Sequence, residues 1–245
     1  MELDSTWAQD WVRRSAQAMT QQRNELIDLD RAIGDGDHGE NLDRGFAAAV
    51  AQLDAVAETD DAPHTVADVL RITAAALMRH VGGAAGPLLG TGLLRAAREA
   101  EAQNDVIDSH GIARILDAAA QGISARGRAV VGDKTMVDVW VPAAQAAHRA
   151  ADEGGCPGQV LAAAAQAARS GAKDTEAMVA KRGRASFLGE DSRDHRDPGA
   201  QSSALMLLCA AQAAAAMHAA QDHEAPCAAL THEALSSLPD LGDLS

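Results

Sequence analysis

The sequence predicts an all-α domain. Alanine supplies much of the 47% hydrophobic content, and alanine favours helices that pack closely together. No stretch alternates β-branched and polar residues over the length of a strand. A chain of 245 residues is long enough for a well-buried core, and no linker marks a second domain. We therefore expect one domain over residues 1–245, with its core at about residues 5–222 and an acidic C-terminal tail.

Apolar residues recur with helical spacing along most of the chain, and polar or glycine-containing segments separate these stretches. Pro87 favours the first turn of a helix, because its missing N–H costs nothing there, and Gly171 marks a helix end. The pattern predicts helices at about residues 5–29, 42–54, 65–80, 87–103, 110–121, 135–152, 158–170, 174–180 and 202–221.

The net charge of −14 argues against nucleic acid and anionic membranes as partners, because both are bound through basic residues. The N-terminus is acidic and lacks the apolar core of a signal peptide. The apolar run at residues 204–220 contains Gln212 and His218, which favours a buried helix over a membrane span. We expect a cytoplasmic protein with reduced thiols, because no CxxC or zinc spacing is found among Cys156, Cys209 and Cys227.

An acidic, glycine-rich segment joins the first two expected helices, at residues 29–41. It brings Asp30, Asp35 and Asp37 close together in the chain, and crowded carboxylates repel one another unless a cation compensates. Oxygen ligands suit a hard cation, and Mg²⁺ commonly binds a few carboxylates, waters and substrate phosphates. The segment therefore predicts a magnesium site, with an acidic surface turn as the alternative.

Three further connections have unusual compositions. The glycine-rich turn at residues 81–92 leads into a helix and resembles a phosphate cradle, although a plain helix–helix turn explains it equally well. Residues 126–136 gather three cationic side chains in an otherwise acidic chain. Residues 181–200 form a long charged loop, in which Lys181 and Arg184 face either phosphates or solvent.

Four motifs follow one another along the chain: Ile33-Gly-Asp-Gly-Asp-His-Gly-Glu-Asn41, Gly82-Gly-Ala-Ala-Gly-Pro-Leu88, Gly132-Asp-Lys-Thr-Met136, and Gly183-Arg-Ala-Ser-Phe-Leu-Gly189 with Asp197-Pro-Gly-Ala200. Together they resemble the nucleotide-binding L subunit of dihydroxyacetone kinases, a domain that also forms half of the single-chain, ATP-dependent kinases. The resemblance implies an antiparallel barrel or bundle of about eight helices, with the nucleotide in the loops at one end.

The resemblance also implies a set of site residues. Two Mg²⁺ ions are expected on Asp30, Asp35 and Asp37, bridging the phosphates of ADP or ATP. Phosphate and ribose contacts are expected at His38, Gly39, Glu40, Asn41, Ala84 and Ala85. Adenine-side contacts are expected at Gly127, Met136, Arg184, Asp197, Pro198 and Gly199. Ala85 stands where members of the family usually have Ser or Thr, so one hydrogen bond to a phosphate is missing.

The resemblance implies a kinase activity shared between subunits. The terminal phosphoryl group passes to dihydroxyacetone, or a related small ketose, held on a separate K-type subunit. We expect a phosphotransferase-system route, in which an M-type subunit rephosphorylates bound ADP. One alternative is a subunit with exchangeable ATP, and another is an ADP-sensing module that binds a transcription regulator. We also expect a homodimer.

Overall fold

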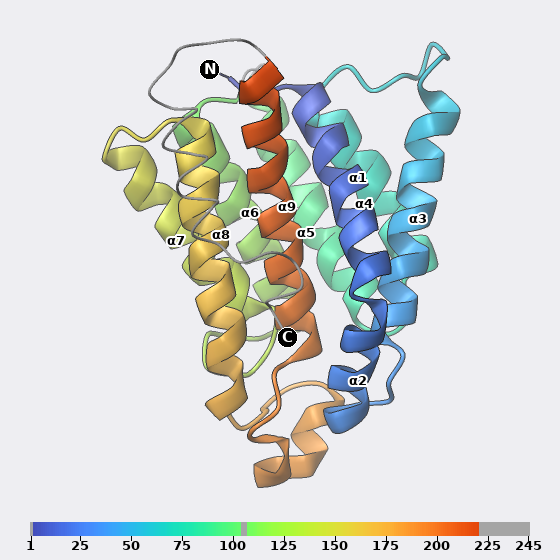
Figure 1. Ribbon diagram of the computed structural model, residues 1–245, viewed down its shortest axis with the longest axis vertical. Coiled ribbons are helices and arrows are strands. Elements are labelled where there is room, and N and C mark those ends of the chain that lie inside the picture. The colour runs from blue at the N-terminus through green and yellow to red at the C-terminus, as the bar shows by residue number, and fades with distance from the viewer. Residues whose placement is uncertain (1, 104–106, 221–245) are drawn as a thin grey trace.

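The computed structural model describes residues 2–103 and 107–220 (Figure 1). These residues are mostly helical, and their only strand-like pairing joins Leu3 to Ile107. The elements are α1 (Ser5–Gln21), α2 (Arg23–Ile33), α3 (His38–Val56), α4 (Val66–His80), α5 (Ala85–Glu101), α6 (Ser109–Gly127), α7 (Val137–Asp152), α8 (Pro157–Asp174), the 3₁₀ turns η1 (Thr175–Ala177) and η2 (Arg184–Ser192), and α9 (Pro198–Ala220).

The long helices form a closed antiparallel barrel, as the resemblance to the kinase subunit implies. Each packs on the next in the order α1, α3, α4, α5, α6, α7, α8, α9, and α9 returns to α1. α2 lies at the lower end in Figure 1, where it packs against α3, α9 and η2. α2, η2 and the start of α9 therefore lie close together, along with the loops at that end of the barrel.

α9 is buried on nearly all sides, which explains its apolar composition. It is the one helix among the described residues that is long and apolar enough to cross a membrane, yet 72% of that stretch lies inside the protein. Trp7 and Trp11 of α1 stack on each other and donate their indole N–H groups to backbone carbonyls of α9, at Ala210 (3.0 Å) and Met206 (2.8 Å). The helix therefore belongs to the protein core.

The structure corrects several expected helix bounds. The first predicted helix is two helices, because the backbone leaves helical geometry at Gln22 (φ −95°, ψ 9°), and α2 then continues past Asp30. α9 starts at Pro198, before the predicted residue 202. Asp197 accepts a hydrogen bond from Ala200 N at 2.7 Å, so the Asp-Pro pair begins a helix where the end of a loop was expected.

The cysteine prediction is half right. Cys209 is a free, buried thiol. Cys156 is disulfide-bonded, which contradicts the expectation that the thiols are reduced. Cys227 and the expected acidic tail lie outside the described residues.

Candidate functional site

A cavity of about 600 Å³ opens at the end of the barrel where α2 and η2 lie. Its volume is in the range of small-molecule sites. The lining comes from segments far apart in the chain, which include all four motifs. All but two of the predicted site residues line it: Asp30, Asp35, Asp37, His38, Asn41, Ala84, Ala85, Gly127, Met136, Arg184, Asp197, Pro198 and Gly199.

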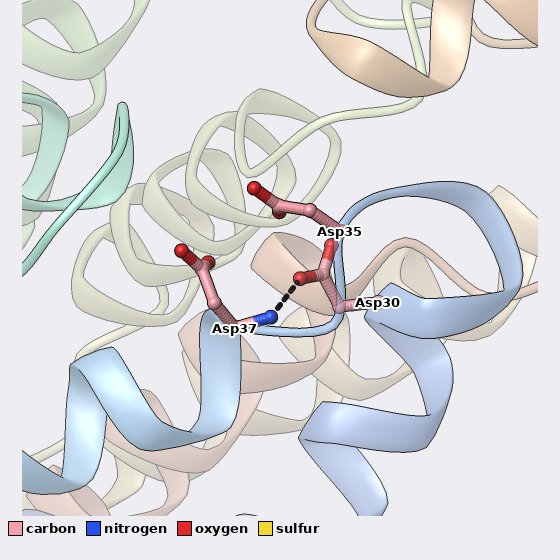
Figure 2. A group of neighbouring side chains, drawn as sticks. All are labelled: Asp30, Asp35 and Asp37. Atoms are coloured by element: carbon pink, nitrogen blue, oxygen red, sulfur yellow. Dashed lines mark hydrogen bonds between the residues drawn. The ribbon is translucent and has the colours of Figure 1, made fainter.

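The three predicted metal ligands face one another on one wall (Figure 2). Asp30 is buried, Asp35 and Asp37 are exposed, and each offers an oxygen within 4.8 Å of the others. One oxygen of Asp30, Oδ2, accepts the backbone N–H groups of Asp37 (2.8 Å) and His38 (3.1 Å), which fixes the carboxylate in place. Three convergent carboxylates form a donor set that fits a hard divalent cation.

Glycines make the tight turn of this acidic loop possible. A Cβ atom on Gly34 would lie 2.2 Å from Asp30 Oδ1, so any side chain there would displace the carboxylate. Gly36 has a φ of +76°, a conformation that other residues rarely adopt. The spacing of Asp and Gly in this segment is therefore what lets the carboxylates converge.

His38 links the acidic loop to α9. Its Nε2 atom lies 2.9 Å from Ser202 Oγ, and it also hydrogen-bonds the backbone of Pro198. Burial lowers the pKa of His38, against the opposing charges of Asp30 and Asp37. The neutral ring thus lines the cavity and connects the acidic loop to the start of α9.

Gly39 and Glu40 lie outside the cavity, unlike the contacts expected there. Gly39 is buried against α2, where an added Cβ would lie 2.2 Å from Arg23 O and 2.9 Å from Ile27 Cγ1. Glu40 points to solvent and pairs with Arg23 at 2.8 Å. Their roles in this structure are close helix packing and an exposed ion pair.

Replacing Gly39 with Ala is expected to destabilise the fold by about 1–3 kcal/mol, because the backbone of α2 would have to move away from α3. Urea unfolding with circular dichroism measures this loss. Ala47, which is exposed on α3, offers the matched control Ala47→Gly, whose cost of about 1 kcal/mol reflects helix propensity alone. An unchanged midpoint in Gly39→Ala would show that the two helices have slack at this contact.

The N-terminus of α5 forms another wall. Ala84 occupies the N-cap position, and no side chain caps the helix, so its first N–H groups are left for a ligand. Asn41 packs against Gly82, which lies just before this helix: a Cβ atom on Gly82 would be 2.9 Å from Asn41 Oδ1. The positive end of the helix dipole therefore faces the same cavity as the carboxylates, as an anion site requires.

The third wall contains Asp197, Pro198 and Gly199 at the start of α9, and Gly199 packs against Met136. Burial raises the pKa of Asp197 to about 7, although the nearby Lys134 ammonium lowers it. The cavity lining also contains apolar side chains from several segments that the sequence did not single out as site residues. In the sequence they resemble ordinary core residues: Ile33, Leu88, Ile123, Ala129 and Val137.

Lys134 is a further cavity residue that the sequence alone did not single out. Its side chain is almost fully buried, and its Nζ donates to the carbonyls of Thr175 (2.6 Å) and His195. Burial lowers the pKa of this lysine, and the charges of Asp197 and Glu176 oppose that effect. A φ of +61° at Lys134 marks a strained backbone, which is common at functional sites.

Arg184 lies beside the carboxylate cluster. Its guanidinium contacts Asp35 Oδ2 at 2.7 Å, so in this structure it pairs with a candidate metal ligand. The expectation placed Arg184 on the adenine side. In this structure its partner is Asp35, one of the expected metal ligands, and the adenine-side role stays a prediction.

Carboxylates and an uncapped helix N-terminus around one cavity define a class of protein, a helical domain built to hold a cation together with a phosphorylated ligand. The DAK2 domain family matches residues 32–229, and the chain belongs to this family.

Relatives in bacteria match nearly from end to end. The chain is 38% identical over 214 residues to the "PEP-dependent dihydroxyacetone kinase, ADP-binding subunit DhaL" of Escherichia coli (strain K12), covering 87% of this chain and 99% of the relative. It is 37% identical to the "PEP-dependent dihydroxyacetone kinase 1, ADP-binding subunit DhaL" of Listeria innocua serovar 6a, over 84% of this chain and 95% of the relative.

The fold has a counterpart among solved structures. The dihydroxyacetone kinase of C. freundii, solved in complex with AMP-PNP and Mg²⁺, superposes with a TM-score of 0.65 over 86% of this chain and 34% of the kinase. The sequence identity is 21%, so this likeness supports the fold alone.

Proposed function

We propose that this chain is the nucleotide-binding subunit of a kinase for dihydroxyacetone or a related small ketose. One observation carries the proposal: a single cavity joins three convergent carboxylates to the uncapped N-terminus of α5. A metal ion on the carboxylates and a phosphate at the N-terminus of α5 would together hold a nucleotide polyphosphate. The near full-length relatives are named as ADP-binding subunits, which supports ADP as the nucleotide.

In this proposal Asp30, Asp35 and Asp37 hold two Mg²⁺ ions. The bound ions would supply charge neutralisation for the phosphoryl group, which is the main requirement of phosphoryl transfer. The N–H groups at Ala84 and Ala85 face the phosphates. The apolar wall around Met136 receives the base, and Asp197, Pro198 and Gly199 close the cavity beside it. Gly127 and Asn41 complete the lining, and Gly39 and Glu40 support it from outside.

The phosphoryl acceptor in this proposal is a ketose on a separate K-type subunit. The names of both bacterial relatives include phosphoenolpyruvate dependence, which favours bound ADP that an M-type subunit of a cytoplasmic phosphotransferase system rephosphorylates. Exchangeable ATP is the alternative route. Homodimerisation and binding to a transcription regulator stay predictions.

Native mass spectrometry of the freshly purified chain tests the proposal. A mass that includes ADP and Mg²⁺ after buffer exchange supports the bound-cofactor route. An empty chain that takes up Mg-ATP reversibly supports the exchange route. A chain that binds neither nucleotide in Mg²⁺ contradicts the proposal. Adding K-type and M-type subunits, phosphoenolpyruvate and dihydroxyacetone then tests phosphoryl transfer.

Replacing Ala85 with Ser is expected to tighten ADP binding. Ala85 is the first residue of α5 and lines the cavity, so a hydroxyl there would reach the phosphate that the helix N-terminus receives. One added hydrogen bond is worth about 1 kcal/mol, or about fivefold in affinity. Isothermal titration calorimetry measures the change, and Ala57→Ser, on the exposed end of α3, is the control. Equal affinities would place the phosphate away from this turn.

A further inference from the structure

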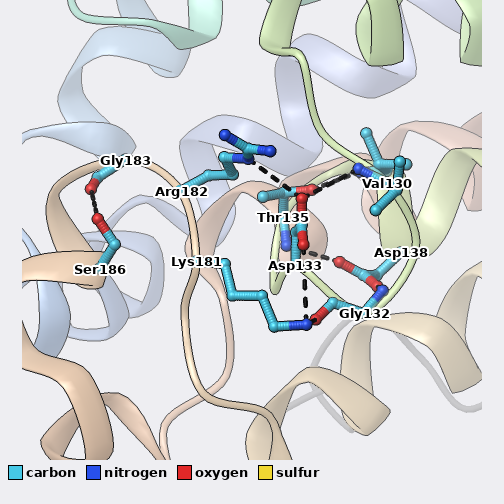
Figure 3. A network of polar contacts seen from close by, with 10 residues as sticks. Val130, Gly132, Asp133, Thr135, Asp138, Lys181, Arg182, Gly183 and Ser186 are labelled. Carbon is cyan, nitrogen blue, oxygen red and sulfur yellow. Dashed lines mark hydrogen bonds and ion pairs between the residues drawn. The ribbon is translucent and has the colours of Figure 1, made fainter.

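Two contacts hold the segment that carries Arg184: an apolar cluster around Ala185, and the buried carboxylate of Asp133, which has no assigned role. Asp133 is 4% exposed and lies in the loop between α6 and α7 (Figure 3). It accepts hydrogen bonds from Val130 N (3.1 Å) and Arg182 Nε (3.2 Å), and Lys181 Nζ lies 3.8 Å away. Asp133 O also accepts the backbone N–H of Lys181 at 3.1 Å.

The loop around Asp133 is itself rigid. Asp138, at the start of α7, accepts the backbone N–H groups of Gly132 and Thr135. Lys181 Nζ donates to Gly132 O at 2.9 Å, which adds a second link to the same loop. Asp133 therefore holds residues 181 and 182 in a fixed position relative to the start of α7.

Arg184 follows only two residues later. Between them Gly183 has a φ of +65°, and the chain then enters η2. Ala185 packs with Ile33 of α2 and Ala180 in a small apolar cluster, which holds the segment beside the acidic loop. At the end of this path the Arg184 guanidinium meets Asp35.

The ion pair has a consequence for metal binding. A divalent cation on Asp35 competes with the Arg184 guanidinium for the same carboxylate, because Arg184 contacts Oδ2 at 2.7 Å. A polyphosphate that arrives with the cation offers Arg184 a new anionic partner. The same arginine therefore opposes binding of the bare cation and favours binding of the metal–nucleotide complex.

We propose that Asp133 is a positioning residue that, through Lys181 and Arg182, holds Arg184 as the counter-ion of Asp35 until a metal–nucleotide complex replaces that pair. The Arg184–Asp35 ion pair thereby favours a cation that arrives bound to a phosphate ligand and disfavours a cation that arrives alone. This inference rests on the proposed function, because it takes Asp35 as a metal ligand.

The experiment compares two affinities in each variant, for Mn²⁺ alone by electron paramagnetic resonance and for Mg-ADP by calorimetry. Arg184→Gln is expected to bind Mn²⁺ about two- to fivefold more tightly, since an exposed ion pair is lost, and Mg-ADP about tenfold more weakly. Asp133→Asn is expected to shift both affinities in the same directions by smaller factors. In an Arg184→Gln background, Asp133→Asn is expected to change neither.

A merely structural role for Asp133 would weaken both affinities and would persist without Arg184, and either result overturns the proposal. Lys181→Gln repeats the test from an exposed side chain that does not line the cavity, in case Asp133→Asn fails to fold. Glu190→Gln is the matched control, because it removes an exposed ion pair to Arg193 at the end of η2 and is expected to change neither affinity.

Limited proteolysis measures directly how firmly residues 181–184 are held. Trypsin cleaves after Lys181, Arg182 and Arg184, and these bonds are expected to be cut faster in Asp133→Asn than in Glu190→Gln. Equal cutting rates would contradict the positioning role. If no variant, including the wild type, binds Mg-ADP, the proposed nucleotide function fails, and the Mn²⁺ and trypsin results still decide the role of Asp133.

Discussion

Replacing Asp37 with Asn is expected to weaken Mg²⁺-dependent ADP binding by at least about 100-fold. Changes to groups that only support a metal ligand already cost about 10- to 100-fold in metal affinity, so losing a ligand should cost at least as much. Asp37 suits this test because its side chain caps no backbone group of α3 and makes no ion pair among the described residues, whereas Asp35 also holds Arg184. Calorimetry with and without Mg²⁺ measures the effect.

Asp28→Asn is the matched control. Asp28 lies half a turn before Asp30 on α2, its carboxylate pairs with Arg31 at 2.6 Å, and it does not line the cavity. Its removal is expected to leave ADP affinity unchanged. Wild-type affinity in Asp37→Asn, or an equal loss in Asp28→Asn, would refute the assignment of the carboxylate cluster to metal.

The sequence predicted the helices well because burial in a helical barrel imposes a regular apolar spacing. It failed where tertiary contacts decide. The break at Gln22 and the extension of α2 to Ile33 leave the spacing of apolar residues intact, so no local signal marks them. The Asp197-Pro198 pair fits both a turn and a helix start, and only the packing of α9 in the core selects the second.

The acidic wall of the site was predictable because its residues are neighbours in the chain. Helical geometry then sorts the residues that follow. His38 and Asn41 are three positions apart on α3 and both line the cavity, whereas Gly39 and Glu40 face α2 and solvent.

Residues whose partners lie far along the chain were not predictable. Lys134 meets carbonyls 41 and 61 residues away, and Asp133 meets Arg182 at a separation of 49 residues. A single sequence contains no spacing rule for such contacts. The motif around Lys134 stood out only because its cations are unusual in an acidic chain.

Asp197 carries the second large prediction, a change in the pH dependence of stability. Its pKa is raised from 3.8 to about 7, first of all by burial, with Asp138 and Asp30 adding to the rise and Lys134 opposing it. Between these two values the folded chain holds a proton that the unfolded chain has released. Stability therefore falls as pH rises from about 4 to about 7, by about 4 kcal/mol from this one group.

Asn at position 197 has no proton to lose and still caps α9 through its side-chain oxygen. In metal-free and nucleotide-free protein, the free energy of unfolding of Asp197→Asn relative to wild type is expected to rise by about 4 kcal/mol between pH 4 and pH 8. Urea unfolding at a series of pH values measures it. Asp54→Asn, which removes an exposed pair with Arg13, is expected to give a flat difference. A flat difference for Asp197→Asn as well would mean that the buried carboxyl is ionised at low pH. A positive side chain would then have to neutralise the carboxylate, and the candidate is Lys134, whose charge already lowers the pKa of Asp197.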